Sequence, residues 1–114
     1  MVEFSKSLVS GTKIISRNEK IDYVRGYFDA EGGIARSLKV RYYIYFAQKN
    51  LTDLKEVKKY LEELNIGCGK IHNPSRNADP DYWRFYVSAK SYKKFAQIIG
   101  SWHPVKSCFL RMKI

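Results

Sequence analysis

Residues 40–48, VRYYIYFAQ, alternate between two kinds of side chain, and this alternation constrains the fold more than any other feature of the chain. On an extended strand one face carries Tyr42, Ile44 and Phe46, and the other carries Arg41, Tyr43 and Tyr45. Successive side chains of a strand point to opposite faces, so the pattern predicts a strand that is buried on one face and solvated on the other. The strand therefore belongs to a sheet with one covered face.

The clearest helix follows this strand. After Asn50, apolar residues recur at three- and four-residue spacing, and lysines and glutamates fill the positions between them. This spacing predicts an amphipathic helix that Asn50 caps at its start and Gly67 ends. Its apolar positions are Leu51, Leu54, Val57, Leu61 and Leu64.

The rest of the chain continues the alternation of helices and strands. The sequence predicts a helix over 20–30, strands within 34–48, a second strand pair at 70–72 and 82–87, a helix over 91–99, and a short last helix from Pro104 that carries Val105, Cys108, Phe109 and Met112. The order αββαββα, with this additional helix, indicates an α+β fold. We expect a four-stranded antiparallel sheet with its helices on one face.

The length of 114 residues fits a single domain, 1–114, in which residues 1–19 form a weakly patterned lead-in segment. No apolar run approaches the roughly 18 residues that cross a bilayer, and the N-terminus lacks the apolar core of a secretory signal. The isolated Cys68 and Cys108 favour two buried reduced thiols over a disulfide or zinc site. We therefore expect an intracellular protein, in the cytoplasm, nucleoid or an organelle, that is not secreted and has no membrane partner.

The net charge of +10 is the first indication of function. Lys and Arg number 21 against 11 acids, in a chain that also holds nine tyrosines. A folded basic domain rich in aromatic residues favours a polyanionic partner, of which nucleic acid is the commonest. The alternative is a generic solvated basic surface, and the distribution of the charge decides between the two.

The predicted sheet gathers part of this charge on its helix-free face. Basic and aromatic residues alternate with buried ones along the strands, which gives a surface suited to a duplex groove. Ordinary protection of sheet edges by Lys and Arg is the alternative. The candidate DNA-binding residues are Lys39, Arg41, Tyr43, Tyr45, Lys70, His72, Arg84 and Tyr86.

The stretch YVRGYFDAEGGI, residues 23–34, ends a predicted helix in an acid, Glu31. The last turn of a helix carries unpaired carbonyls and partial negative charge, so a carboxylate there is unfavourable by a few tenths to about 1 kcal/mol. Glu31 is therefore either an exposed residue solvated by water, or an acid that a positive group compensates.

Residues 24–32, VRGYFDAEG, resemble the LAGLIDADG motif of homing endonucleases, with matches at Gly26, Asp29, Ala30 and Gly32. The resemblance continues through YIYFAQKN at 43–50, WRFYVSAKSYKKFAQII at 83–99 and HPVKSCFL at 103–110. It implies a saddle-shaped sheet and a homodimer, because one motif makes half a site. The two motif helices would pack at a two-fold axis through Tyr23, Gly26, Tyr27 and Ala30.

The resemblance also implies a chemistry. The family hydrolyses phosphodiester bonds of double-stranded DNA at long, roughly palindromic sites, and many of its members are encoded within introns. By similarity, Glu31 and the carbonyl of Ala30 would hold Mg²⁺ or Mn²⁺. Gln48 would orient a water, and Lys90 would stabilise developing charge. Arg25 replaces a small residue of the motif and should point away from a close helix contact.

Two other functions fit the same fold. An RNA-binding maturase that assists intron splicing would keep the basic sheet and the dimer without needing a metal. A DNA-binding protein without cleavage would keep specificity alone. The set Glu31, Gln48 and Lys90 argues for cleavage, because a protein that only binds has no need of it.

Overall fold

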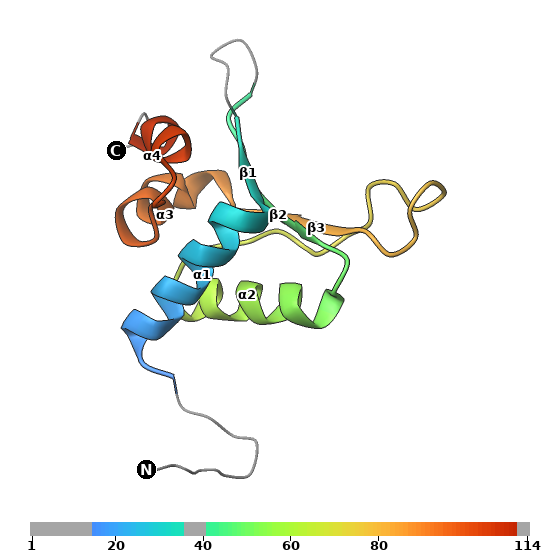
Figure 1. Ribbon diagram of the computed structural model, residues 1–114, viewed down its shortest axis with the longest axis horizontal. Helices are drawn as coiled ribbons and strands as arrows, with labels where there is room; N and C mark the ends of the chain where they lie inside the picture. The colour runs from blue at the N-terminus through green and yellow to red at the C-terminus, as the bar shows by residue number, and fades with distance from the viewer. Residues whose placement is uncertain (1–14, 36–40, 112–114) are drawn as a thin grey trace.

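The computed structural model describes residues 15–35 and 41–111 of the chain. Its elements, drawn in Figure 1, are α1 (Arg17–Glu31), β1 (Gly32–Ile34), β2 (Ile44–Gln48), α2 (Leu51–Glu63), β3 (Trp83–Tyr86), the 3₁₀ helix η1 (Ala89–Ser91), α3 (Tyr92–Ile98) and α4 (Pro104–Arg111). Helices and antiparallel strands share one core, which confirms the predicted α+β fold. None of the helices in the described ranges has the length and hydropathy needed to span a membrane.

Within the described residues, three strands form an antiparallel sheet, in the order β1, β2, β3. The predicted fourth strand, at 70–72, is reduced to two isolated bridges that join Cys68 to Val87 and His72 to Arg84. The pairing register shifts by one residue between these two bridges, so the segment bulges and a regular ladder does not continue. The segment 68–72 still lies along β3 as the edge of the sheet.

Helix α1 begins three residues earlier than the sequence predicted. The hydroxyl of Ser16 accepts a hydrogen bond from the Glu19 N–H (3.1 Å), and the Glu19 carboxylate accepts one from the Ser16 N–H (3.0 Å). This reciprocal pair satisfies two donors at the start of the helix. Residues 17–19 therefore belong to α1, while residues 1–14 of the predicted lead-in lie outside the described residues.

Helix α2 forms as predicted, with the Asn50 side chain accepting from the Asp53 N–H at 3.1 Å. Its end differs from the prediction, because the chain leaves the helix at Asn65, which has a φ of +64°. Asparagine tolerates this left-handed conformation better than most residues. Gly67 follows the helix end and does not cap it; its N–H instead donates to the Ser91 hydroxyl at 2.9 Å.

The core lies between the sheet and the helices. Phe28 of α1, Phe46 of β2, Phe85 of β3 and Phe95 of α3 are fully buried, and their rings contact one another at centroid distances of 5.1–6.0 Å. Such aromatic contacts add to the stabilisation from burial. The apolar face predicted from the alternation of residues 40–48 is thus confirmed at Ile44 and Phe46.

Helix α4 turns a different face inward than its sequence predicted. Val105 and Cys108 are exposed, Phe109 is partly buried, and Met112 lies outside the described residues. The buried residues of the helix are Lys106 and Leu110, one turn apart. The prediction considered only apolar residues as buried, whereas the structure buries Lys106.

The two thiols should differ in reactivity. Cys108 is exposed, whereas burial raises the pKa of Cys68 to about 12, and only the thiolate reacts readily. We expect a thiol-specific disulfide reagent near neutral pH to modify Cys108 rapidly and the partly buried Cys68 much more slowly. Cys108→Ser should abolish the rapid phase and Cys68→Ser should retain it; the reverse result would contradict the orientation of α4.

Candidate functional site

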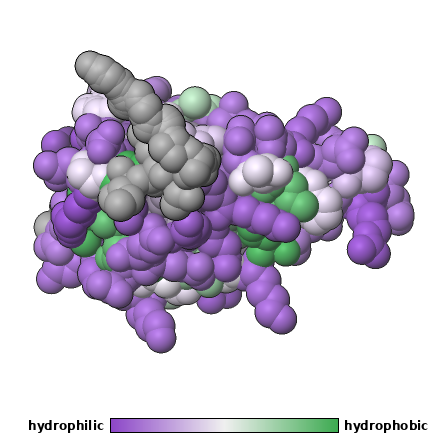
Figure 2. Space-filling view, turned by 90° about the horizontal axis from the view of Figure 1, so that it is seen from below, coloured by the Kyte–Doolittle hydropathy of each residue, from purple (hydrophilic) through white to green (hydrophobic). Residues whose placement is uncertain are grey.

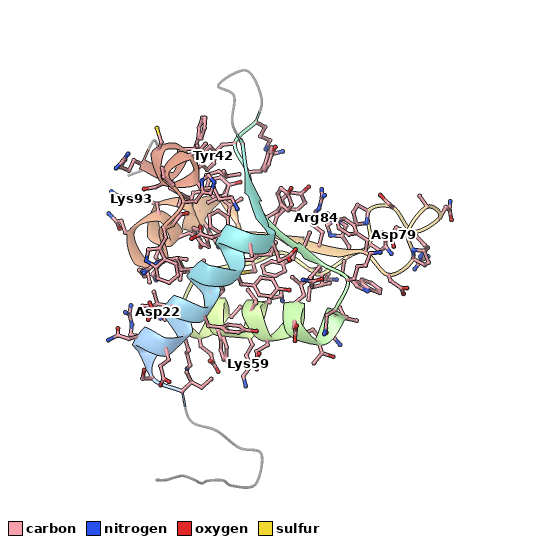
Figure 3. All side chains as sticks on the ribbon, in the orientation of Figure 1. Asp22, Tyr42, Lys59, Asp79, Arg84 and Lys93 are labelled. Atoms are coloured by element: carbon pink, nitrogen blue, oxygen red, sulfur yellow. The ribbon has the colours of Figure 1, made fainter. Side chains whose placement is uncertain are left out.

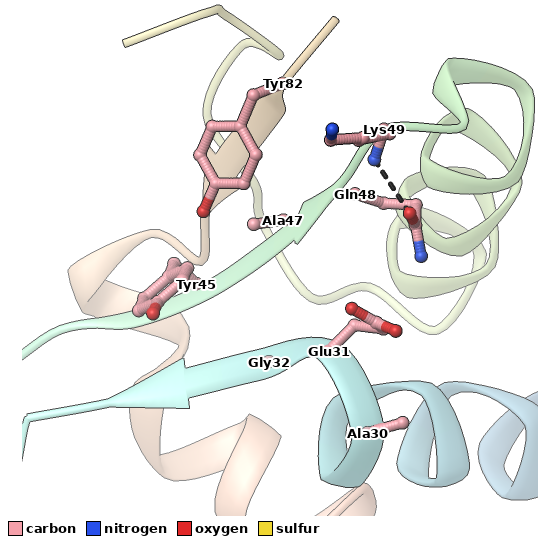
Figure 4. Close-up of a pocket in the computed structure, with 8 residues that line it drawn as sticks. All are labelled: Ala30, Glu31, Gly32, Tyr45, Ala47, Gln48, Lys49 and Tyr82. Carbon is pink, nitrogen blue, oxygen red and sulfur yellow. Dashed lines mark hydrogen bonds between the residues drawn. The ribbon is translucent and has the colours of Figure 1, made fainter. Parts of the chain in front are cut away.

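An open pocket of about 420 Å³ lies where the end of α1 meets the end of β2. Figure 4 shows its lining residues, Ala30, Glu31, Gly32, Tyr45, Ala47, Gln48, Lys49 and Tyr82. Strand β1 starts directly after Glu31 and pairs with β2, with Gly32 opposite Phe46. Because β1 and β2 pair in this register, the end of α1 lies next to the end of β2, and Glu31 and Gln48 line the same pocket.

The two glycines after Glu31 make this turn possible. A Cβ at Gly32 would collide with the Phe28 ring and approach the Phe28 carbonyl at 2.7 Å, and a Cβ at Gly33 would collide with the Tyr45 ring. Only glycine lets the backbone pass so close to neighbouring groups. The sequence EGG therefore joins the acid to the sheet with no intervening loop.

A buried ammonium group closes the end of α1. Lys106 of α4, 5% exposed, donates from Nζ to the carbonyls of Phe28 (2.7 Å), Asp29 (3.0 Å) and Gly32 (3.0 Å). The same group lies 5.0 Å from the centre of the Phe28 ring. A cation at a helix C-terminus satisfies unpaired carbonyls and opposes the partial negative charge there. Lys106 thus supplies positive charge beside the exposed acid, in a place that the sequence did not indicate.

The other flank of α1 is held by the turn between α3 and α4. The Asp29 carboxylate accepts from the Ser101 hydroxyl and from the Trp102 N–H (3.0 Å), which gives it a structural role. Arg25 Nε donates to the Ile99 carbonyl, and its guanidinium lies 4.8 Å from the Trp102 ring centre. Arg25 therefore turns away from the open face of the helix, as predicted.

This leaves small residues on the open face of α1. Ala30 is exposed and Gly26 is partly exposed, with Tyr23 (38% exposed) and Trp102 (61% exposed) beside them. Tyr27 points inward instead, with its ring 6.3 Å from that of Phe46, and burial raises its pKa. Of the four predicted interface residues, Tyr27 thus contributes mainly to packing within the protomer.

The predicted basic and aromatic face forms around Arg84 of β3. Its guanidinium lies 4.4 Å from the Tyr45 ring centre and donates to the hydroxyls of Tyr82 (3.0 Å) and Tyr86 (3.3 Å). His72 lies nearly parallel to Tyr86, at a centroid distance of 6.0 Å. These contacts hold Arg84 in one orientation next to the pocket, and Figure 3 shows it on the sheet.

The remaining candidates lie at other places. Lys39 falls outside the described residues. Arg41 and Tyr43 line a second cleft of about 430 Å³ with Tyr86, at the far end of the sheet face. Lys70 lines a groove with lysines of α2, at the edge of the sheet.

Lys90 is exposed in η1 and does not line the pocket of Glu31 and Gln48, so its catalytic role stays a prediction. The sequence reasoning missed Lys49 and Tyr82, which line that pocket, and Lys106. Lys49 could have been found from its position directly after Gln48. Figure 3 shows Asp79, which lies 3.9 Å from the Lys49 ammonium, on the loop that leads into β3.

The donor set of the pocket fits a hard divalent ion in part. Within residues 15–35 and 41–111, no three His, Cys, Asp or Glu side chains are grouped closely enough to hold a metal. Glu31 is the carboxylate among the described lining residues. Mg²⁺ keeps several waters and is commonly held by one or two carboxylates together with substrate phosphates. The pocket therefore suits an ion shared with a phosphate and a second carboxylate, and does not form a complete protein cage.

Comparison with known proteins agrees with this geometry. Residues 18–100 match the profile of the LAGLIDADG-like domain. The chain is also 33% identical over 89 residues to the homing endonuclease I-ApeI of Aeropyrum pernix, a match that covers 77% of this chain and 38% of that protein. The chain belongs to the LAGLIDADG homing endonuclease family. It spans less than half the length of this curated relative.

Solved structures support the fold assignment. The structure of I-DmoI in complex with DNA and Mn matches 75% of this chain and 44% of its own, with a TM-score of 0.59 and 24% identity. The structure of I-DmoI in complex with DNA and Ca matches 87% of this chain and 50% of its own, with a TM-score of 0.66 and 21% identity. The LAGLIDADG fold thus accommodates the described helices and sheet.

Lys106 should be necessary for stability. Lys106→Met keeps the apolar stem but leaves the carbonyls of Phe28, Asp29 and Gly32 without this donor, at a cost of about 1–3 kcal/mol in the free energy of unfolding. Urea denaturation measures the change. The matched control, Lys94→Met on the exposed face of α3, should stay within about 0.5 kcal/mol. Equal stability of the two variants would contradict the role of Lys106.

Proposed function

We propose that this chain is a site-specific DNA endonuclease that acts as a homodimer on a long, roughly palindromic duplex site with a divalent metal, Mg²⁺ or Mn²⁺. One observation carries the proposal: Glu31, at the end of α1, shares an open pocket with Gln48 beside a basic and aromatic sheet face. An acid next to a surface that attracts phosphates is unfavourable for binding alone, so its placement supports metal-assisted cleavage.

Four of the lining residues have roles that their positions support. The Glu31 carboxylate and the Ala30 carbonyl are the proposed metal ligands. Gln48 orients the attacking water through its side-chain amide. Lys49 lines the pocket and is better placed than Lys90 to stabilise charge on the attacked phosphate. The metal, when bound, stabilises the negative charge of the phosphate and makes a neighbouring water more acidic.

The sheet face is the proposed surface for double-stranded DNA. Arg84 uses one N–H of each terminal nitrogen on a tyrosine hydroxyl, so further N–H donors remain for a base edge or phosphate. Its contacts with Tyr82, Tyr86 and Tyr45 fix the guanidinium before DNA arrives, which lowers the entropic cost of binding. Arg41 and Tyr43 extend this surface along the sheet.

Homodimer formation completes the site in this proposal. Gly26 and Ala30 lie one turn apart on the open face of α1 and let a second helix approach closely. A two-fold contact there places the same residues of both copies against each other. The two Glu31 carboxylates then lie next to the axis and supply the second acid that one chain lacks.

Removal of the Glu31 charge should separate binding from cleavage. Glu31→Gln keeps the size of the side chain, so we expect loss of Mg²⁺-dependent cleavage with DNA affinity unchanged or higher, because less negative charge faces the phosphates. Incubation with a library of duplexes and Mg²⁺, followed by sequencing of the cut ends, measures cleavage. Glu63→Gln, at the end of α2 and outside the pocket, is the control.

A Glu31→Gln variant that still cuts at the wild-type rate would remove Glu31 from the mechanism. Wild-type protein that binds duplexes and never cuts would favour the non-cleaving DNA-binding alternative. Preferential binding of intron RNA without cleavage would favour a maturase. The three outcomes differ in which nucleic acid is bound and whether it is cut.

Gly26 offers a test of assembly that is separate from folding. A Cβ at Gly26 would lie 3.8 Å from the Trp102 ring, an ordinary contact, so a side chain can start at this position without a collision within the protomer. We expect Gly26→Leu to keep the wild-type melting temperature at low concentration while weakening the dimer by about 1–3 kcal/mol per site through overpacking. Sedimentation measures the dimer, with Thr52→Leu on the exposed face of α2 as control. A monomeric wild type with DNA bound would contradict the proposal.

A further inference from the structure

Four lysines converge on a groove at the flank of the molecule, away from the pocket of Glu31. The groove, of about 390 Å³, lies between α2 and the edge segment 68–72. Its lining residues are Lys55, Lys58, Lys59, Glu62, Lys70 and Ile71. Seen from below in Figure 2, the molecule is largely hydrophilic, with long side chains projecting from it.

The charge in this groove is not balanced by the protein. Lys58 pairs with Glu62 at 3.1 Å, and Glu62 is the acid among the described lining residues. Lys55, Lys59 and Lys70 are exposed and have no ion pair with another residue of the described ranges. Four ammonium groups thus face one carboxylate across a concave surface.

Three of the four groove lysines lie close together on α2. Lys55 is three residues from Lys58 and four from Lys59, and like charges at these spacings repel one another on a helix. Other acids of α2 contact groups outside the groove: Glu63 pairs with Lys20 at 3.0 Å, and Glu56 accepts from the Tyr60 hydroxyl at 3.3 Å. A phosphate-bearing partner would remove the repulsion that the protein leaves in place.

The groove is continuous with the sheet face through the edge segment. Lys70 lines the groove, and His72, two residues later, stacks against Tyr86 on the sheet. Two residues of extended chain span about 7 Å. A strand of nucleic acid that leaves the sheet face at His72 therefore reaches Lys70 within a short distance.

We propose that the groove of Lys55, Lys58, Lys59 and Lys70 binds phosphates of the DNA that flanks the duplex held on the sheet face. The contact extends the footprint around the edge of the sheet and contributes affinity without sequence information, because phosphates carry none. This inference rests on the proposed DNA binding and adds a second contact region to it. A merely solvated helix face is the competing explanation.

The test compares two double variants that remove equal charge. The groove variant removes the two exposed lysines of α2 that line the groove, by Lys55→Gln and Lys59→Gln. The control variant removes two exposed lysines of α3, by Lys93→Gln and Lys94→Gln. Figure 3 labels Lys59 on α2 and Lys93 on α3, on separate parts of the surface. Dissociation constants are measured against salt concentration on duplexes of about 15 and about 40 base pairs, without metal.

Each lysine that neutralises a phosphate contributes about 0.9 to the slope of log K against log salt concentration. We expect the groove variant to reduce this slope by about 2 on the long duplex and to leave it unchanged on the short one. The control variant should follow the wild type on both duplexes. Circular dichroism melts confirm that both variants fold.

Four outcomes would overturn the inference. Equal slopes for groove variant and wild type on the long duplex would mean that the lysines are only solvated. An equal decrease of the slope on both duplexes would mean that the groove lysines contact DNA within the footprint of the sheet face. An equal decrease of the slope in the control variant would mean that the effect comes from the net charge of the protein. Wild-type protein that binds neither duplex would remove the proposed function together with the groove, whereas the first three results leave it intact.

Discussion

The contact between the Lys106 ammonium group and the last carbonyls of α1 is the interaction on which the candidate site depends. Helix α1 has no basic residue in its own last turn, so the positive charge comes from α4, far along the chain. Lys106 bonds both to the end of the helix, at Phe28, and to the start of β1, at Gly32. It thereby fixes the backbone on either side of Glu31, which leaves that carboxylate exposed in the pocket.

This fixed acid sits within a chain of net charge +10. The basic surfaces attract phosphates over distances of about a Debye length, roughly 10 Å at moderate salt, while Glu31 opposes them only at close range. The basic surfaces thus favour the approach of a duplex, whereas Glu31 disfavours a phosphate in the pocket unless a cation binds there together with the phosphate. In the proposed function, affinity and metal dependence therefore arise from different residues, which is why substitution of one acid is expected to affect cleavage and binding differently.

The sequence predicted those features whose signal is local. The period of α2, the Asn50 cap and the alternation around Ile44 and Phe46 depend on near neighbours, and the structure has all three. Features set by distant contacts were missed. Lys106 is buried because carbonyls at the end of α1 accept its hydrogen bonds, and Lys70 lines the groove because the edge segment lies next to α2. No window of sequence around either lysine contains that information, although the motif resemblance did bring Glu31 and Gln48 together correctly.

The open face of α1 is the surface at which the proposed dimer contact lies. Ser101, Trp102 and Ile99 hold the helix on one flank, Lys106 holds its end, and the core holds its buried face, so the stripe with Gly26 and Ala30 is what remains for a partner. Ala30 on this stripe directly precedes Glu31. In the proposed dimer, a two-fold contact that places Ala30 of both copies next to the axis brings the ends of the two helices together, and Lys106 fixes the backbone on either side of each Glu31 in that arrangement.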